Sequence, residues 1–231
     1  MVKRIGAGCV PAGLDLLQPF QVGWYNAAVE AAYCLPDLGQ PAHLGVLIGN
    51  TRALWAPFVG ALRRDPSRLD STEPLDAYVI TTVTEALRSL PLRWQVRWAH
   101  DTQAPVAMQR LAHVSGLAHL APSHLSVHRV HGPWIALRAV VVVDVAGPPG
   151  PAPAPRNPCA DCEHDCMAAY RRALTVAGDV AASHAALSEH WTEWLAVRDA
   201  CPTGRSHRYT DDQVRYHYTK DRAVLRAAVR S

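Results

Sequence analysis

Phenylalanine and charged residues are scarce in this sequence, and runs of basic residues are absent. Only 2 of the 231 residues are Phe, and charged residues make up 19% of the chain. The formal net charge is +3, with no stripe of Lys and Arg. We therefore expect no nucleic-acid partner, although a local pocket for an anion remains compatible with this charge. Because 49% of the residues are hydrophobic, the chain can bury a substantial core, which excludes global disorder.

Long apolar segments are missing as well. The longest apolar run, residues 135–145, contains Arg138 and is too short to span a bilayer. The first residues, MVKRIGAGCVPAG, include no apolar stretch of signal length. The 6 Cys residues do not resemble a secreted disulfide framework, because three of them fall within eight residues. We therefore expect a cytoplasmic protein with reduced thiols and no membrane partner.

Several common catalytic motifs are also absent. The chain has no G-x-S-x-G nucleophile elbow, no Gly-rich phosphate loop with a Lys, and no H-E-x-x-H zinc motif. These absences argue against the corresponding hydrolases, nucleotide-binding proteins and metalloproteases. No catalytic residue is assigned from the sequence.

Hydrophobic periodicity predicts helices and strands without regular βαβ spacing. Residues 44–49 are typical of a buried strand, and residues 53–63 and 76–90 of helices. Residues 92–99 alternate between apolar and polar, which predicts a half-exposed antiparallel strand with a Trp-rich inner face. Residues 134–145 form the most apolar segment, so we expect a central strand there. The mixture predicts an α+β fold with an antiparallel sheet.

Less regular segments lead to four further predictions. We expect a helix that begins after Pro19 and ends near residue 33, and a second helix over residues 105–119. Residues 125–130 and 134–145 are predicted to be strands around a His131-Gly132-Pro133 turn. A helix is also expected over residues 183–198.

A proline-rich segment divides the chain. Residues 147–158 are predicted to form an extended connector. Residues 1–146 would then form an α+β core. Residues 159–231 would form a Cys-containing helical cap that packs on this core as part of one integrated domain, with a helix near residues 167–177.

Five segments occur in an order that resembles a known family. They are PFQVGWYN at residues 19–26, HVSG at 113–116, GPWIALR at 132–138, HWTEW followed by RDA at 190–200, and RYTDDQ at 208–213. Together they resemble the cobalamin type C protein family over residues 9–225. The resemblance implies a flavin-reductase or nitroreductase-like antiparallel sheet flanked by helices, with a C-terminal helical cap.

The resemblance also implies a function. Family members bind cobalamin base-off and remove its upper axial ligand. They do so by reductive decyanation with a reduced flavin (FMN or FAD), and by dealkylation onto glutathione or another low-molecular-weight thiol. Detaching the lower base makes cobalt easier to reduce. Two alternatives stay open: a non-catalytic cobalamin carrier that serves a downstream cobalamin-dependent enzyme, and a cobalamin-linked iron–sulfur redox protein. A monomer and a homodimer are equally compatible with the sequence.

Arg138 interrupts an otherwise apolar strand. A charge in that position needs a partner or a water-lined cavity, because an unpaired buried charge is costly. One interpretation is a buried salt bridge. By the resemblance, Arg138, Arg198 and Arg222 instead bind the carboxylates of the thiol cosubstrate, a task that suits the planar guanidinium group.

The resemblance also implies a cobalamin-binding surface. Its members are Phe20, Gln21, Trp24, Tyr25, Asn26, His113, Gly116, His128, Gly132 and Trp134. Aromatic side chains are usually core residues, but their flat faces also suit a corrin or isoalloxazine ring. His113 and Gly116 repeat a His-x-x-Gly motif in which His binds cobalt. Here Leu111 replaces the Asp that orients that His, so we expect His113 to line a pocket or the core.

The cysteines depart from the family pattern. Cys159, Cys162 and Cys166 form C-x2-C-x3-C, and Cys201 precedes Pro202. Thiolates at such spacing can bind one metal centre, and a Cys-Pro ligand is found in iron–sulfur sites. The CPTG string also resembles a segment of epoxyqueuosine reductases. An iron–sulfur cluster, a zinc site that includes His164, and free redox-active thiols are all compatible with this pattern.

Overall fold

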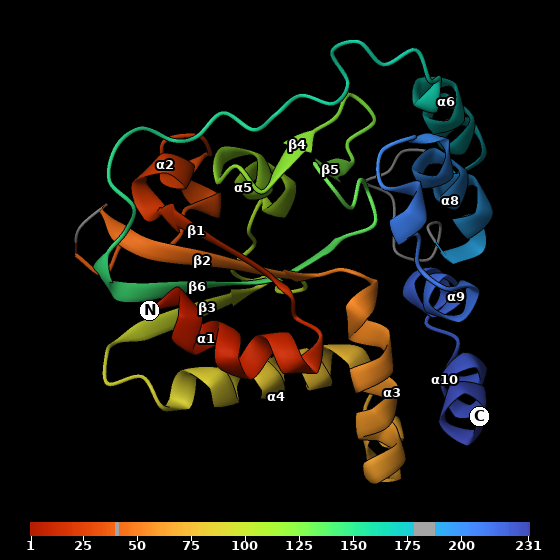
Figure 1. Ribbon diagram of the computed structural model, residues 1–231, viewed down its shortest axis with the longest axis horizontal. Helices are drawn as coiled ribbons and strands as arrows, with labels where there is room; N and C mark the ends of the chain where they lie inside the picture. The colour runs from red at the N-terminus through yellow and green to blue at the C-terminus, as the bar shows by residue number, and fades with distance from the viewer. Residues whose placement is uncertain (40–41, 178–187) are drawn as a thin grey trace.

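A four-stranded antiparallel sheet forms the centre of the protein (Figure 1). The computed structural model describes residues 1–39, 42–177 and 188–231. The strands follow the order β1 (Leu16–Gln21), β2 (His43–Asn50), β6 (Ala136–Ala146) and β3 (Trp94–Trp98). A separate two-stranded sheet pairs β4 (Ala118–Leu120) with β5 (Ser126–His128). The predicted α+β class with an antiparallel sheet is confirmed.

Strand β6 is central, as its composition predicts. It pairs with β2 on one side and β3 on the other. Successive side chains of a strand point to opposite faces, and those of β6 are apolar on both. Val141 and Val143 belong to one core cluster, whereas Val140 and Val142 belong to another. Both faces of the sheet must therefore be covered by other elements.

Helices cover the two faces. Below the sheet in Figure 1 lie α1 (Val2–Cys9), α3 (Trp55–Arg64) and α4 (Pro74–Arg88). Above it lie α2 (Val22–Asn26), α5 (Met108–Val114) and the small sheet. The Trp-rich inner face predicted for β3 is confirmed, because Trp94, Val96 and Trp98 pack against the cluster below the sheet.

The proline-rich connector lies on the core. Residues 147–158 contain no helix or strand and pass over α2 and α5 (Figure 1). The indole Nε1 of Trp24 donates to the carbonyl of Gly150 at 3.1 Å, and Gln21 Nε2 donates to the carbonyl of Pro148 at 3.4 Å. Gly116 has φ +80°, and a Cβ there would lie 2.8 Å from Pro153. The connector is thus held by the predicted cobalamin-binding segment.

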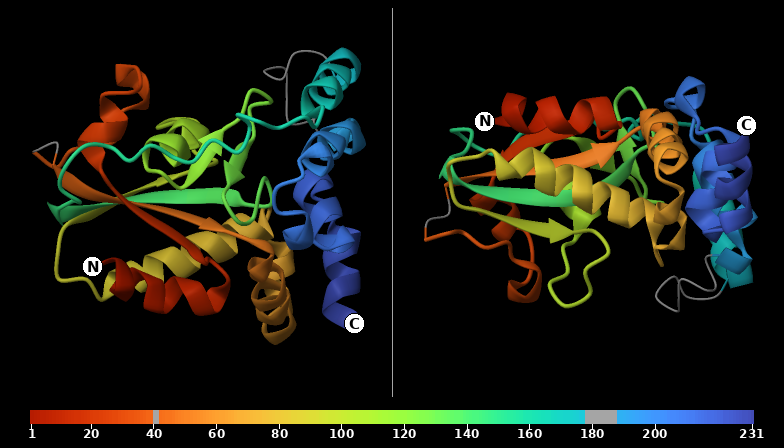
Figure 2. Two further views of the ribbon diagram at one scale, coloured as in Figure 1. Left: turned by 45° about the horizontal axis from the view of Figure 1, so that its top comes forward. Right: turned by 90° about the horizontal axis from the view of Figure 1, so that it is seen from below.

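The C-terminal helices, which we call the cap, lie along one end of the sheet (Figure 2). They are α6 (Cys166–Ala177), α8 (Trp191–Ala200), α9 (Asp211–Thr219) and α10 (Arg222–Arg230). Helix α10 is tied to α3, because Arg63 donates to the carbonyls of Ala228 and Val229 at 2.7 and 3.2 Å. The cap prediction is confirmed as architecture, while the division of the chain at residues 147–158 stays a prediction.

The segment around Pro19 corrects one prediction. Residues 16–21 form edge strand β1, and the helix that follows is only the five residues of α2, with a 3-10 turn at Ala31–Tyr33. Pro19 removes a backbone donor. An edge strand tolerates this loss, so the pairing with β2 prevails over the expected helix. Phe20 and Gln21 are therefore strand residues.

Two other predictions are corrected by glycines. The helix expected over residues 105–119 is shortened to α5, because Gly116 at φ +80° ends it and allows β4 to follow. Strand β5 pairs with β4 and not with β6, because Gly132 at φ +56° bridges back to His128. Of the helix expected over residues 183–198, residues 183–187 lie outside the described part, and α8 begins only at Trp191.

Helix α1 was not predicted from the sequence, although its Ile5 and Cys9 are fully buried. Among the residues that the structure describes, no helix has both the length and the apolar character needed to cross a membrane.

Candidate functional site

A cavity of about 500 Å³ lies between β6, α5 and the cap. We call it the arginine cavity. Its lining includes Met108, Gln109, Arg138, Arg198, His217 and Tyr218. The volume falls within the range of roughly 300–1,000 Å³ that is usual for small-molecule sites. Its most unusual feature is the presence of two arginines in one wall.

Arg138 is mostly buried in this wall. Its side chain is 12% exposed, and its Nη1 lies 4.0 Å from Asp76 Oδ1. Its Nε donates to Asn50 Oδ1 at 2.7 Å. Burial lowers the pKa of the Arg138 guanidinium, while the neighbouring Tyr209 and Asp76 oppose that shift. The buried salt bridge that the sequence suggested is thus present between Arg138 and Asp76, but only at the limit of ion-pairing distance.

Arg198 reaches the same cavity from α8. The residue is 5% exposed, and its hydrogen-bond partners among the described residues are the carbonyls of Pro133 and Ile135. Its guanidinium also lies over the rings of Trp134 and Tyr209, at 4.6 and 5.1 Å from their centroids. A buried charge that contacts only neutral groups is costly. Together with Arg138 it favours an anionic ligand.

Arg222 is not among the residues that line the arginine cavity. Its guanidinium donates to the carbonyls of Leu69, Ser71 and Thr72 at 2.7, 2.5 and 2.9 Å. These contacts fasten the start of α10 to the loop before α4. The structure brings together two of the three predicted thiol-binding arginines, and the assignment of Arg222 stays a prediction.

Several predicted cobalamin-binding aromatics are core residues in this structure. Phe20 and Tyr25 are fully buried and Trp134 is 1% exposed. The Tyr25 hydroxyl accepts from the backbone N–H of Ala107 at 2.9 Å, and burial raises the pKa of this phenol. These rings shape the walls of the core, and none of them lines the arginine cavity.

The neighbouring polar residues organise loops. Asn26 accepts from the Leu35 N–H and donates to the Leu35 carbonyl, both at 2.9 Å. Gln21 and Trp24 hold the connector, as described above. His113 Nδ1 accepts from the Leu120 N–H at 3.2 Å, and its ring meets that of His119 at 5.5 Å. His113 thus joins α5 to β4, and its expected pocket or core position stays a prediction.

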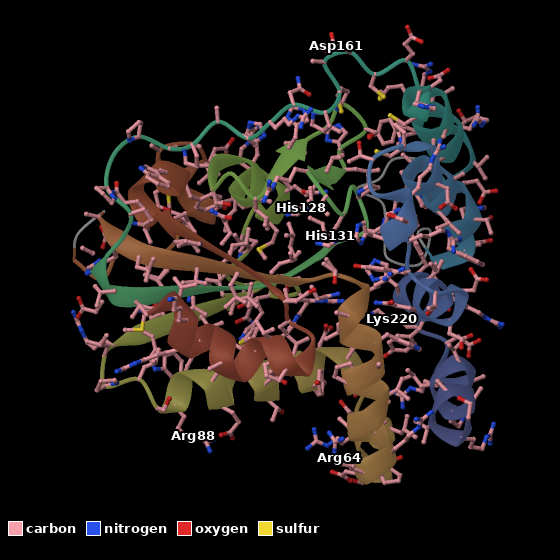
Figure 3. The ribbon with its side chains drawn as sticks, in the orientation of Figure 1. Arg64, Arg88, His128, His131, Asp161 and Lys220 are labelled. Carbon is pink, nitrogen blue, oxygen red and sulfur yellow. The ribbon has the colours of Figure 1, made fainter. Side chains whose placement is uncertain are left out.

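His128 belongs to a histidine cluster at the boundary between core and cap (Figure 3). Its ring stacks on His131 at 4.9 Å, and His131 meets His207 at 4.5 Å. Burial lowers the pKa of His128 to about 4 and also lowers the pKa of His131. Both rings are therefore neutral near pH 7. Gly132 lies beside this cluster and packs against the backbone of Thr203.

The four predicted metal ligands line one small enclosed pocket. Cys159, Cys162, Cys166 and Cys201 share this cysteine pocket of about 20 Å³ with His164. Asp161, which is labelled in Figure 3, lies in the chain between Cys159 and Cys162. Burial raises the pKa of the Cys159 and Cys201 thiols. Within residues 1–39, 42–177 and 188–231, however, no three His, Cys, Asp or Glu side chains form a group that could hold a metal ion.

Leu125 lines both the cysteine pocket and the arginine cavity. The two sites are therefore neighbours, separated by the segment that enters β5.

Sequence reasoning did not single out His217 and Tyr218, which line the arginine cavity, or Asn50, which lies outside its lining and contacts Arg138. Asn50 ends β2 and orients Arg138, while His217 and Tyr218 come from α9. The only signal for the last two was their position shortly after the RYTDDQ segment. Tertiary packing alone brings α9 against β6.

Comparison with models of known protein families finds no match. Solved structures share the fold. A C. elegans B12-trafficking protein CblC, described as a human MMACHC homologue, superposes with a TM-score of 0.73 at 17% identity, over 98% of this chain and 95% of that chain. Epoxyqueuosine reductase from Streptococcus thermophilus gives a TM-score of 0.54 at 10% identity, over 98% of this chain and 79% of that chain. These neighbours confirm the fold class, a nitroreductase-like antiparallel sheet flanked by helices.

Curated relatives are similar over nearly the whole chain. The protein named cyanocobalamin reductase / alkylcobalamin dealkylase from Homo sapiens is 28% identical over 236 residues, which cover 94% of this chain and 77% of that protein. The protein of the same name from Danio rerio is 27% identical over 235 residues, which cover 91% of this chain and 86% of that protein. These relatives confirm the resemblance found in the five ordered segments.

Proposed function

We propose that this protein is a cobalamin-processing enzyme. It binds cobalamin base-off and removes the upper axial ligand by reductive decyanation, by thiol-dependent dealkylation, or by both. The observation that carries the proposal is the arginine cavity, in which Arg138 and Arg198 line one space. Arg138 has Asp76 only at 4.0 Å, and the hydrogen bonds of Arg198 within the described residues go to backbone carbonyls. The relatives named for these reactions, similar over 94% of the chain, support it.

In the dealkylation, the two arginines bind the carboxylates of glutathione or another low-molecular-weight thiol. Bidentate guanidinium–carboxylate contacts fix the direction of a bound thiol, and a partly enclosed cavity strengthens them. The thiolate sulfur then attacks the alkyl carbon of the cobalamin substrate. A sulfur–carbon bond forms, the cobalt–carbon bond breaks, and its electron pair stays on cobalt. The protein contributes binding and orientation.

Decyanation requires electrons in place of a nucleophile. We propose reduced FMN or FAD as the donor. The cavity has room for one ligand of moderate size. We therefore treat the flavin as a cosubstrate that binds and dissociates in each catalytic cycle. We also propose a cytoplasmic location, and the free cysteines of the protein support it.

The proposal is tested by adding the protein to methylcobalamin and recording the visible spectrum. We expect a band shift toward the base-off form, followed by thiol-dependent loss of the methyl group. An unchanged spectrum would contradict the proposal. Binding without release of either ligand, in the presence of thiol and reduced flavin, would indicate instead a carrier for a downstream cobalamin-dependent enzyme.

The cysteine pocket supports a second proposal, a bound metal centre that is either an iron–sulfur cluster or a zinc ion. Its four thiols suit a thiophilic metal, and the fold gathers them from segments 35 residues apart (201 − 166). Their side chains do not converge as placed, so no step of the reaction is assigned to a metal.

Metal analysis distinguishes these possibilities. The protein is purified without oxygen, alongside the Cys201→Ser variant and a Cys34→Ser control, since Cys34 is exposed and does not line the pocket. Iron with labile sulfide that disappears in Cys201→Ser indicates a cluster, and zinc with the same dependence indicates a zinc site. Four reactive thiols without metal would identify the pocket as a thiol site.

A further inference from the structure

Besides the two arginines, the titratable side chains that line the arginine cavity are those of His217 and Tyr218. His217 lies on α9 and lines the cavity together with Arg138 and Arg198. Its ring meets the edges of Tyr209 and Tyr218, at 6.1 and 5.3 Å between centroids. Unlike His113, whose Nδ1 has a backbone donor, its ring has no hydrogen-bond partner in the described part of the chain.

The surroundings of His217 keep its ring neutral. Burial lowers the pKa of His217 well below its usual value, and the positive charges of Arg138, Arg198 and Lys220 act in the same direction. These arginines come from β6 and α8, and Lys220 follows α9. The other ionisable groups against the ring are the phenols of Tyr209 and Tyr218. A neutral imidazole has one nitrogen that can accept a proton.

We propose that His217 is the base that removes the proton from the thiol cosubstrate. This inference rests on the proposed dealkylation, and it assigns a catalytic residue to that reaction. The thiol proton moves to the free imidazole nitrogen, and the sulfur keeps the electron pair of the broken S–H bond. This sulfur attacks the alkyl carbon, and cobalt retains the electrons of the cobalt–carbon bond. The proton then passes from the imidazolium to water.

The two arginines influence both the thiol and the imidazole of His217. Their charges bind the carboxylates and stabilise the thiolate that forms. The same charges disfavour the imidazolium, so the ring returns its proton to solvent and is ready for the next thiol. The base and the anion-binding groups thus belong to one electrostatic unit, drawn from β6, α8 and α9.

The variant His217→Gln distinguishes a role of His217 as a base from a role as a hydrogen-bond acceptor. Glutamine retains a side-chain acceptor of similar reach but takes up no proton in this pH range. His124→Asn is the matched control, because His124 is exposed and lies outside the cavity lining, and its positive φ suits Asn. Near-UV circular dichroism and the base-off spectrum with methylcobalamin verify that both variants fold and bind the substrate.

The first readout is the pH profile of kcat for methylcobalamin dealkylation. The wild type should be nearly independent of pH from about 6.5 to 8.5, because His217 is unprotonated throughout. His217→Gln should be roughly 100-fold slower at neutral pH, and its rate should rise about tenfold per pH unit as the free thiol ionises. His124→Asn should follow the wild type. Equal rates and profiles for wild type and His217→Gln would overturn the inference.

The second readout uses a cosubstrate that needs no base. A selenol analogue of the thiol is already ionised at neutral pH, so His217→Gln should react within about threefold of the wild type. A deficit as large as with the thiol would show that His217 has only a structural role. A wild type that binds methylcobalamin but dealkylates it with neither cosubstrate would refute the proposed function. Failure of the His217 assignment alone leaves the wild type active.

Discussion

Arg198 of α8 lies over the indole ring of Trp134, with its guanidinium carbon 4.6 Å from the ring centroid. The same guanidinium donates to the carbonyl of Pro133 at 2.5 Å. One cap side chain therefore fixes both the backbone and the ring at the entrance to β6. The position of the cap and the shape of the arginine cavity depend on the same contact.

Replacement of Arg198 should affect stability as well as binding. Arg198→Ala leaves the Pro133 carbonyl and the Trp134 ring without a partner, which should cost about 3 kcal/mol in the free energy of unfolding. Arg198→Lys keeps the charge but not the fork geometry, and should cost about half as much. Urea unfolding measures both values. Arg171→Ala, whose side chain is 66% exposed, should stay within about 0.5 kcal/mol of the wild type.

The thiol-binding arginines can be separated by their kinetics. Arg138→Lys should raise the KM for a thiol with carboxylate groups about tenfold, with a smaller effect on kcat, because a lysine cannot bind a carboxylate bidentately. Arg222→Lys should lower the stability instead, since Arg222 binds three backbone carbonyls. An equal rise in KM for Arg222→Lys would place this residue in the thiol site, as the family resemblance implies.

Two glycines allow the loop after Cys201 to pack closely against the turn that contains His131. Gly132 and Gly204 have φ of +56° and +73°, and a Cβ on either would overlap the backbone of the opposite turn. Gly204→Ala should therefore cost at least about 3 kcal/mol and loosen the cysteine pocket. Gly150→Ala is the control, because Gly150 has φ +88° and open space around it. It should cost only about 1 kcal/mol, as measured by thermal unfolding.

The histidine cluster should make the fold sensitive to acid. The folded-state pKa of His128 is about 4, below the usual value of about 6.5. Between these values the unfolded chain binds more protons, so stability is lost as the pH falls through this window. His128→Gln should reduce the loss between pH 7 and pH 5 by about 1–2 kcal/mol, allowing for solvent screening.

Urea unfolding at the two pH values tests this expectation. A residual slope should remain in the variant, because burial also lowers the pKa of His119 and His131. An unchanged slope would show that His128 titrates normally in the folded protein.

Local patterns of apolar and polar residues were sufficient to predict the framework of the fold. The apolar composition of residues 134–145 predicts a strand buried on both faces, and the alternation in residues 92–99 predicts a half-exposed one; both predictions are confirmed. The order of five short segments likewise identified the relatives. These patterns can be recognised without a structure because each lies within one continuous segment of the chain.

Tertiary structure alone decided which of these stretches meet. Pairing with β2 made a strand of the segment around Pro19. Packing of α8 and α9 against β6 joined Arg198 and His217 to Arg138, and left Arg222 outside the cavity. Such contacts follow from burial shared between segments that are distant along the chain, and local periodicity contains no information about the partner of a buried face.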